Sequence, residues 1–334
     1  MTKPLISVVI PAYNAEKTIE ATIESVLNQS YTAIELIVVD DGSIDKTVNV
    51  VWRMRPKCNQ HGIKLHLVAQ QNSGVSVARN RGVQEAQGDL IAFLDADDEW
   101  LENKLSCHAT HIQRSPEVGL SFAKVNFLTT KGSLRTSSKL PNRELKAEDC
   151  LSANPTISPS NWVMKKSVFQ QLNGFDESMT HAEDQEFLIR LLRDTEFKIK
   201  GIEHVLVNYA TSQEGLSADI DSMYEGWQAL IESLRDKNGL VENYASHHMS
   251  YCLFLAKRTV HISQDYSLGF KYLSRAMVAA PLEVMLNPKQ AISIFIGLMY
   301  GCINVARRGV ARRLVIKKIV SKKNQANVSE VKNV

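Results

Sequence analysis

Three carboxylates lie within four residues of the chain, at Asp95, Asp97 and Asp98. A continuous apolar run at 90–94 precedes them, so the sequence predicts that they follow a buried strand. Carboxylates this close together repel one another and raise each other's pKa unless a cation lies among them. Oxygen ligands of this kind suit Mg²⁺ or Mn²⁺. We therefore expect a divalent cation here. The alternative is that Asp98 only caps the helix that follows.

Polar segments also follow the other apolar runs of the N-terminal third. They read PAYN at 11–14, DDGS at 40–43 and NSG at 72–74, and the last of these precedes Arg79. In an open parallel sheet, ligands bind outside the carboxyl ends of the strands. We expect these segments to contribute to one binding site, although an isolated Asp-Gly-Ser is also common in turns.

The elements that must position these residues alternate between strand and helix. Short apolar runs at 5–10, 35–40, 64–69 and 90–94 are each followed by a stretch with helical spacing. Repeated strand–helix units predict a parallel sheet with helices on both faces. A further strand is expected at 119–128, where the sheet turns mixed. The chain from 222 to 280 is predicted to be mainly helical.

Four segments in this order resemble the motifs of the glycosyltransferase family 2 enzymes. They are SVVIPAYN from residue 7, ELIVVDDGSIDKT from 35, NSGVSVARNRGVQEAQGDLIAFLDADDEW from 72, and GFDESMTHAEDQEF from 174. The resemblance covers roughly residues 5–210. It implies an α/β protein of the GT-A fold, with a Rossmann-like, mostly parallel central sheet and flanking helices. The C-terminal helical extension is predicted from the helical spacing of residues 222–280, which the resemblance does not cover.

The extent of the resemblance, together with the helical spacing and charge pattern of the remaining residues, predicts a division of the chain into parts. A glycosyltransferase domain would occupy residues 1–215, with its nucleotide-binding half at 1–100 and its acceptor half at 101–215. A helical extension would follow at 216–289, and an apolar and basic tail at 290–334.

The resemblance also implies roles for single residues. Asp184 would be the general base. Asp97 would bind the metal directly, and Asp95 would lie nearer the ribose or the metal's waters. Arg79 would approach the diphosphate. The pocket for the nucleotide base, usually uracil in this family, would be lined by Pro11, Ala12, Tyr13, Asp40 and Asp41.

The reaction implied is metal-dependent, inverting transfer of one hexose from a UDP-sugar to a saccharide or lipid-linked acceptor, in bacterial cell-surface polysaccharide synthesis. Mn²⁺ or Mg²⁺ would be the cofactor. One alternative is a catalytically silent nucleotide-sugar binding module docked on a membrane, and intact Asp97 and Asp184 favour the enzyme. Another is a phosphatase with Asp95 as nucleophile, which the position of the cluster after the fourth strand disfavours. The chain has no Gln-X-X-Arg-Trp, GxGxxG or GxxxxGK[ST] segment, which disfavours processive synthases, dinucleotide-binding proteins and P-loop proteins.

Charge is concentrated at the C-terminal end. The net charge of the chain is +3, but residues 306–334 carry nine Lys or Arg and one Glu, so the remainder sums to −5. Residues 290–306 contain no charge. We expect residues 290–323 to bind an anionic membrane surface, as an apolar anchor beside a basic collar, with a core helix that has a solvated basic end as the alternative. No nucleic-acid partner is expected.

The cysteines and histidines do not indicate a further metal site. The five cysteines form no CxxC pair, so we expect neither a disulfide framework nor a zinc site, and a reducing cytoplasm fits. No export signal is visible at the N-terminus. A cytoplasmic protein, peripheral on the inner face of the membrane, is therefore expected. His108 and His111 are expected on a surface helix without a third ligand, and Trp162 and Trp227 in packing, with sugar stacking by Trp162 as the alternative.

Overall fold

The computed structural model describes residues 3–128, 133–210, 218–234, 243–286 and 288–303. The chain divides into two compact units, Met1–Asn243 and Tyr244–Val334. The first unit contains the central sheet and all four motif segments, and the described part of the second is helical.

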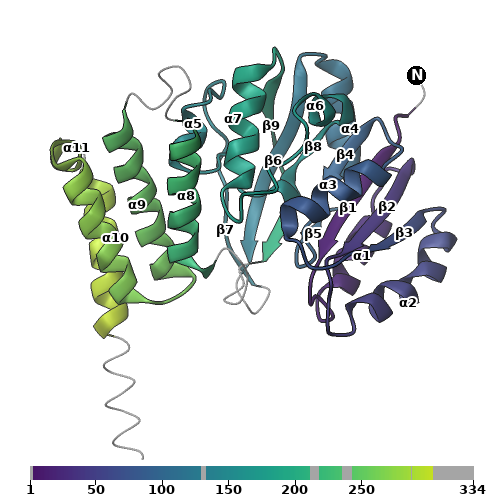
Figure 1. Ribbon diagram of the computed structural model, residues 1–334, viewed down its shortest axis with the longest axis horizontal. Helices are drawn as coiled ribbons and strands as arrows, with labels where there is room; N and C mark the ends of the chain where they lie inside the picture. Colours follow the sequence, from purple (N-terminus) through teal and green to yellow (C-terminus); the bar gives the residue numbers. More distant parts are fainter. Residues whose placement is uncertain (1–2, 129–132, 211–217, 235–242, 287, 304–334) are drawn as a thin grey trace, which may run out of the picture. The chain divides into compact units, whose positions relative to one another are not determined.

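The N-terminal part of the first unit is a parallel strand–helix repeat (Figure 1). Its elements are β1 (Ile6–Ala12), α1 (Ile19–Leu27), β2 (Ile34–Asp40), α2 (Thr47–Gln60), β3 (Lys64–Ala69), α3 (Val75–Glu85) and β4 (Leu90–Phe93). Strand β1 pairs in parallel with both β2 and β4, and β2 pairs in parallel with β3. The predicted strand–helix alternation is confirmed.

The rest of the first unit extends this sheet with strands of both directions. Its elements are β5 (Glu99–Trp100), α4 (Lys104–Arg114), β6 (Val118–Leu128), β7 (Leu134–Ser137), α5 (Asp149–Ser152), the 3₁₀ helix η1 (Pro159–Asn161), β8 (Val163–Lys165), α6 (Lys166–Gln171), α7 (Glu183–Asp194), β9 (Lys198–Ala210) and α8 (Ile220–Leu234). The order across the sheet is β3-β2-β1-β4-β8-β6-β9-β5, with β7 paired to β6. Strand β8 is antiparallel to both β4 and β6, so the sheet turns mixed as expected.

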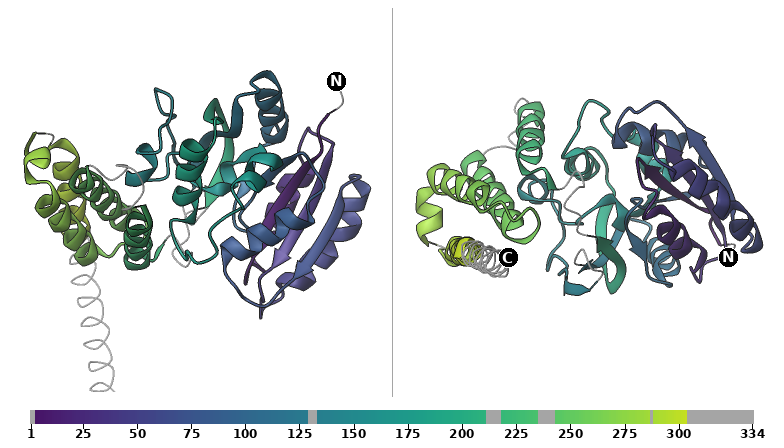
Figure 2. Two further views of the ribbon diagram at one scale, coloured as in Figure 1. Left: turned by 45° about the horizontal axis from the view of Figure 1, so that its top comes forward. Right: turned by 90° about the horizontal axis from the view of Figure 1, so that it is seen from below.

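The sheet is buried between helices, as Figure 2 shows from two further sides. Every residue of β1, β2 and β4 is buried, because parallel strands covered on both faces have no solvent side. Helix α3 lies unusually close to β1. A Cβ atom on Gly82 would come within 2.3 Å of Val9 Cγ1, so the absence of a side chain there permits this approach. Helix α3 can thus hold Arg79 near the carboxyl ends of the strands.

Helix α8 packs within the first unit. Trp227 Nε1 donates a hydrogen bond to the carbonyl oxygen of Leu151 at 2.6 Å, and a Cβ on Gly226 would meet His181 Cβ at 2.5 Å. The predicted domain boundary near 215 lies in residues 211–217, outside the described part, and stays a prediction. The predicted helical extension at 216–289 is shared between the two units, since α8 belongs to the first.

The second unit consists of packed helices. They are α9 (Tyr244–His261), α10 (Tyr266–Ala279), α11 (Pro281–Leu286) and a helix at 289–303. Small residues let these helices approach each other, since a Cβ on Gly269 would lie 2.3 Å from both Thr259 Oγ1 and Leu298 Cδ2. Among the described residues, no helix combines the length and the hydropathy that crossing a membrane requires.

The surface position expected for His108 was wrong. His108 is fully buried on the inner side of α4, where its Nδ1 lies 2.8 Å from Ser121 Oγ and its Nε2 lies 3.3 Å from Lys104 Nζ. The packing role of Trp162 and Trp227 is confirmed. Both indoles have 0% exposure, which leaves Trp162 no surface on which a sugar could stack.

Candidate active site

The predicted nucleotide-binding residues lie at the carboxyl ends of β1, β2 and β4. Ala12 at the end of β1 pairs in register with Asp40 at the end of β2, and Asp95 follows β4 on the other side of β1. Pro11 is buried within β1, whereas Tyr13 is 52% exposed just beyond it. These three strands are neighbours in the sheet, so the predicted residues lie along one edge.

The two carboxylates at the end of β2 have different partners. Both oxygens of Asp41 have protein partners. Oδ1 accepts hydrogen bonds from Gln70 Nε2 and the backbone N–H of Ser73, both at 2.8 Å, and Oδ2 accepts one from Gly74 N–H at 2.9 Å. Asp40 Oδ1 is buried without a partner among the described residues. A buried acceptor without a partner fits a ligand N–H group such as N3 of a pyrimidine. Asp40 therefore keeps binding capacity, while Asp41 fixes the loop before α3.

The Asp-Gly-Ser turn fits closely against that same loop. Gly42 has a φ of +77°, which disfavours residues with a side chain, and a Cβ there would lie 2.8 Å from the backbone nitrogen of Asn72. The Asp-Gly-Ser segment therefore forms a structural turn, which was the alternative expected for it from the sequence.

The acidic cluster after β4 is partly held by neighbouring residues. Asp95 accepts hydrogen bonds from Arg79 Nη2 at 2.7 Å and from Ser158 Oγ at 3.0 Å. Asp98 is buried and accepts a hydrogen bond from the backbone N–H of Ala210 at 2.9 Å. It therefore ties the cluster to the end of β9. The helix-capping alternative for Asp98 was wrong, because the residue at the N-cap of α4 is Asn103.

Asp97 is the member of the cluster that is open to solvent. Although the residue is exposed, partial desolvation of its carboxylate, followed by the charge of Asp95, raises the pKa of Asp97 to about 6. Burial and both neighbouring carboxylates also raise the pKa of Asp98 well above its usual value. A bound cation would offset this repulsion.

The donor set decides what kind of metal site these residues fit. Within the part of the chain that the structure describes, no group of three or more His, Cys, Asp or Glu is arranged to hold a metal ion. Asp97 can supply one accessible carboxylate, whereas both oxygens of Asp95 already accept hydrogen bonds. The residues thus fit a cation that takes most of its ligands from a bound molecule such as a diphosphate.

Arg79 connects this cluster to the start of α7. Its side chain is 4% exposed, with Nη1 2.8 Å from Glu183 Oε1 and Nη2 2.7 Å from Asp95 Oδ1. Its guanidinium also lies over the ring of Phe175, at 5.5 Å. Two carboxylates compensate the buried charge. Direct approach of Arg79 to a diphosphate stays a prediction, while the ion pairs make it a bridge between the two sides of the site.

Asp184 lies at the beginning of α7, where the backbone takes an unusual conformation. Ala182 at the N-cap has a φ of +62°, which is costly for a residue with a side chain, and such strain is often found at functional sites. Burial, followed by the charge of Glu183, raises the pKa of Asp184 to about 7. A carboxylate with a pKa near neutrality suits proton abstraction at physiological pH.

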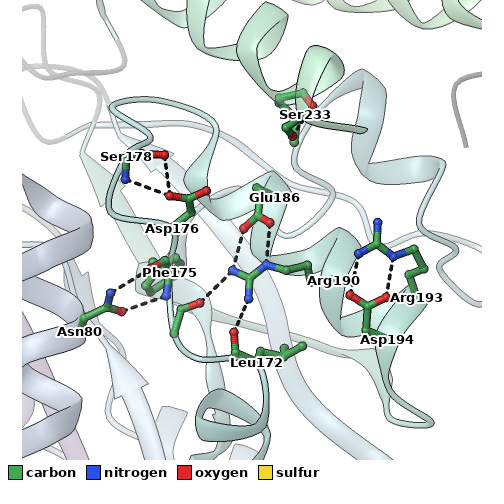
Figure 3. A network of polar contacts seen from close by, with 12 residues as sticks. Asn80, Leu172, Phe175, Asp176, Ser178, Glu186, Arg190, Arg193, Asp194 and Ser233 are labelled. Carbon is green, nitrogen blue, oxygen red and sulfur yellow. Dashed lines mark hydrogen bonds and ion pairs between the residues drawn. The ribbon is translucent and has the colours of Figure 1, made fainter. Parts of the chain in front are cut away.

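The loop before α7 is clamped from both sides (Figure 3). The amide of Asn80 on α3 donates to the carbonyl of Phe175 and accepts from its N–H, both at 2.9 Å. Arg190 on α7 donates to the carbonyl of Gly174 at 2.8 Å and forms an ion pair with Glu186. Asn80 of the third motif segment and Gly174, Phe175 and Glu186 of the fourth therefore have structural roles here. They hold the start of α7 beside α3.

Some residues of the site were missed by the sequence analysis. Asn154 donates to Asp184 Oδ2 at 2.5 Å, and Ser158 donates to Asp95. Both belong to a segment that the sequence showed only as a loop. The signal available was the pairs Asn154-Pro155 and Ser158-Pro159, which fix local turns and their polar side chains.

Comparison with protein families gives a match that includes the carboxyl ends of β1, β2 and β4 and stops before α7. The family model described as glycosyl transferase family 2 matches residues 7–172. The putative teichuronic acid biosynthesis glycosyltransferase TuaG of Bacillus subtilis is 45% identical over 31% of this chain. The matched part spans only 40% of the length of TuaG. The UDP-Glc:alpha-D-GlcNAc-diphosphoundecaprenol beta-1,3-glucosyltransferase WfgD of Escherichia coli is 30% identical over 64% of this chain and 80% of its own length.

Solved structures agree on the fold. The mannosyltransferase PcManGT from Pyrobaculum calidifontis, in complex with GDP-Man and Mn²⁺, superposes with a TM-score of 0.60 at 19% identity, over 91% of this chain and 87% of that one. TarS 1–349 of S. aureus, in complex with UDP-GlcNAc, gives a TM-score of 0.56 at 19% identity, over 91% and 92%. Motifs, fold and relatives agree, and the chain belongs to glycosyltransferase family 2, with the GT-A fold.

Proposed function

We propose that this glycosyltransferase transfers a single hexose from a UDP-sugar to a saccharide or lipid-linked acceptor, with inversion at the anomeric carbon. The observation that carries the proposal is the bridge through Arg79. It joins Asp95, which lies on the same sheet edge as the unpaired oxygen of Asp40 and in the same acidic cluster as the accessible Asp97, to Glu183 next to Asp184. One site can therefore serve both a donor and an acceptor. The names of WfgD and TarS, which specify UDP-Glc and UDP-GlcNAc, support a UDP-sugar as donor.

The residues suit the charges that develop during transfer. Breaking the bond between the sugar and the diphosphate leaves negative charge on the departing nucleotide and positive charge on the sugar. Mn²⁺ or Mg²⁺, when bound at Asp97, would neutralise charge on the leaving diphosphate. Asp184 would take the proton from the acceptor hydroxyl as this oxygen attacks the anomeric carbon. Attack from the side opposite the leaving group inverts the configuration.

A catalytically silent nucleotide-sugar binding module is the second candidate. Such a module would need the carboxyl ends of β1, β2 and β4 with their carboxylates, here called the donor edge, but no base at α7. The raised pKa of Asp184 and the strained backbone before it favour the enzyme, because binding the donor alone requires neither.

A screen of UDP-sugars for protection against thermal unfolding, with and without Mn²⁺, tests the donor class. A ligand at 100 times its Kd should stabilise the protein by about 2.7 kcal/mol. The stabilising UDP-sugar is then incubated with a synthetic lipid-linked GlcNAc diphosphate as acceptor. Sugar transfer supports the enzyme, donor binding without transfer supports the silent module, and release of inorganic phosphate alone supports a phosphatase.

The proposal includes a cytoplasmic location and an anionic membrane surface as a partner through residues 290–323. The acceptor in the name of WfgD is a diphosphoundecaprenol, a lipid-linked molecule, which supports a place at a membrane. The expected tail lies largely in residues 304–334, outside the described part, and only the helix at 289–303 can be examined.

This helix is apolar on two sides. Ala291, Ile294 and Leu298 are buried within the second unit. An outer apolar stripe, between 43% and 66% exposed, recurs at helical spacing and consists of Ile292, Phe295, Ile296, Met299, Tyr300 and Ile303. Four pairs of basic residues follow it in the sequence between 307 and 323, and each basic residue near an anionic surface could contribute about 1 kcal/mol. Apolar surface next to positive charge suits an anionic bilayer.

Vesicle co-sedimentation tests this partner with the full chain. A variant with Ile292→Ser, Ile296→Ser and Tyr300→Ser should lose binding to vesicles containing phosphatidylglycerol. Ile44→Ser, at a site 89% exposed in the first unit, should bind like wild type. Binding should weaken as salt increases and on neutral vesicles. Equal binding of wild type and the triple variant, or sedimentation velocity showing that the stripe joins two copies, would contradict the membrane proposal.

A further inference from the structure

Among the described residues, the carboxylate of Asp184 is fixed from outside its own helix by a single loop residue. Asp184 Oδ1 accepts a hydrogen bond from the backbone N–H of Gln185, which follows it in α7, at 2.7 Å. Oδ2 accepts a hydrogen bond from Asn154 Nδ2 at 2.5 Å. Asn154 is half-buried in the segment between α5 and η1. The orientation of the carboxylate therefore depends on where this amide is held.

The amide of Asn154 has a defined orientation. Its Oδ1 accepts two hydrogen bonds from Thr156, one from the backbone N–H at 2.8 Å and one from the hydroxyl at 2.7 Å. Exchange of the amide oxygen and nitrogen would place the NH₂ group against both of these donors. The NH₂ group is therefore directed at Asp184.

Thr156 is in turn fixed by the core of the first unit. It is fully buried, and its hydroxyl oxygen accepts a hydrogen bond from Trp162 Nε1 at 2.5 Å. Trp162 packs against Phe175 and Phe187, with ring centroids 6.0 and 5.8 Å apart. Phe187 lies on α7, one turn beyond Asp184. A chain of contacts thus runs from the aromatic core through Thr156 and Asn154 to Asp184. It begins at Phe187, which lies on α7 like Asp184 itself.

The charges around Asp184 explain why a donor is needed at this point. Glu183, beside it on α7, opposes its ionisation, and Arg79 on α3 favours it. The thiol of Cys150 on α5 also lies within electrostatic range. The hydrogen bond from Asn154 stabilises the ionised carboxylate without adding a charge, so it counteracts Glu183 and burial.

We propose that Asn154 is a positioning residue for the reaction, which orients Asp184 and keeps it ready to accept a proton. The inference rests on the proposed role of Asp184 as the base. The competing explanation is purely local: the bonds from Asn154 Oδ1 to Thr156 could serve only to shape the loop. The two explanations differ in what happens when the loop bonds are kept and the donor to Asp184 is removed.

Asn154→Asp makes that separation. An ionised Asp keeps an acceptor for Thr156, cannot donate to Asp184, and adds a like charge beside it. At pH 7 we expect turnover to fall about 10- to 100-fold, the usual worth of a hydrogen bond to a charged group. The acidic limb of the kcat–pH profile should move upward by about one unit or more, and the KM for the UDP-sugar should stay unchanged.

Asn80→Asp is the matched control. It makes the same chemical change at another amide that holds a loop, and this amide binds Phe175 rather than Asp184. It should lower the Tm while leaving the acidic limb in place. Should Asn154→Asp fail to fold, Thr156→Val replaces it. Thr156→Val removes a donor to Asn154 at nearly constant volume, and also the acceptor of Trp162 Nε1, so it should lower the Tm and move the limb in the same direction by a smaller amount.

Asp184→Asn, measured alongside, separates two kinds of failure. If Asp184→Asn keeps wild-type turnover, the proposed base is wrong, and the inference falls with it. If Asp184→Asn is inactive but Asn154→Asp keeps the wild-type rate and acidic limb, the inference alone is overturned. A loss of activity in Asn154→Asp that only follows the fraction of folded protein, with an unmoved limb, overturns it as well.

Discussion

The donor edge of the site and the start of α7 hold their carboxylates in different ways. At the donor edge, Asp41 and Asp98 are buried at strand ends and bound by backbone N–H groups of other motif segments or of β9. At α7, Asp184 is half-buried, follows a residue with a positive φ, and is held from outside by one side chain. Backbone N–H groups from other segments hold Asp41 and Asp98, whereas the position of Asp184, the proposed base, depends on the side chain of Asn154.

This difference separates the consequences of substitution. Changes at the donor edge should alter nucleotide binding or folding, because the carboxylates there are the proposed ligand-binding groups or hold loops. Changes near Asp184 should alter the chemical step and leave donor binding intact. Arg79 is the structural link between the two sides, through its ion pairs with Asp95 and Glu183.

The largest expected effect is that of Asp184→Asn. Asn keeps the shape of the side chain but cannot accept the proton, so turnover should fall by about 10² to 10⁴ while the Kd for the UDP-sugar stays nearly unchanged. Steady-state kinetics together with calorimetric titration of the donor measure both quantities. A variant that turns over like wild type, or that is merely unstable, would point to Glu183 as the base.

Next in size is the effect of Asp97→Ala on metal-dependent binding. Loss of the accessible carboxylate should weaken binding of UDP in the presence of Mn²⁺ by about 10²-fold, since charge stabilisation by a metal contributes several kcal/mol. Binding in the presence of a chelator should be the same for wild type and variant. Equal affinity in all four titrations would show that the cluster holds no metal.

The pH dependence of turnover should reveal the raised pKa of Asp184. The base must be ionised, so kcat should fall as pH decreases through about 7 and reach a plateau at higher pH. An ordinary exposed carboxylate would place this limb near pH 4. A profile that stays flat down to pH 5 would mean that Asp184 does not control the rate.

A smaller contrast is expected between the two acids at the end of β2. Asp40→Ala removes Oδ1, which has no partner among the described residues, and one long hydrogen bond of 3.3 Å from the Ser43 N–H to Oδ2, so UDP affinity should fall about tenfold with only a small decrease in Tm. Asp41→Ala leaves three donors without their acceptor and should lower the free energy of unfolding by about 1 to 3 kcal/mol. The reverse outcome would exchange the roles of the two residues.

The donor edge could be predicted from the sequence because its parts are local. Hydrophobic periodicity predicts where β1, β2 and β4 end, and parallel pairing then brings Ala12, Asp40 and Asp95 to one edge. Motif resemblance added Asp184, although nothing in the spacing joins it to this edge. The first prediction rests on strands whose ends show in the sequence, and the second rests on the motif alone.

The partners of these residues could not be predicted, because they come from positions far away in the chain. Asn154 and Ser158 reach Asp184 and Asp95 across 30 and 63 residues. The burial of His108 depends on which side of α4 faces β6, which the helical spacing left open. Long-range side-chain contacts of this kind appear only when the fold is known.

The anomeric configuration of the product tests the central claim most directly. Wild-type protein is incubated with Mn²⁺, UDP-glucose, in which the sugar is α-linked, and a synthetic lipid-linked GlcNAc diphosphate, and the product is examined by mass spectrometry and proton NMR. A UDP-sugar that stabilises the protein better in the thermal screen replaces UDP-glucose. Direct displacement with Asp184 as the base predicts one added hexose in the inverted, β configuration. An α-linked product, or a chain of several added hexoses, would contradict single-step, single-sugar transfer at this site.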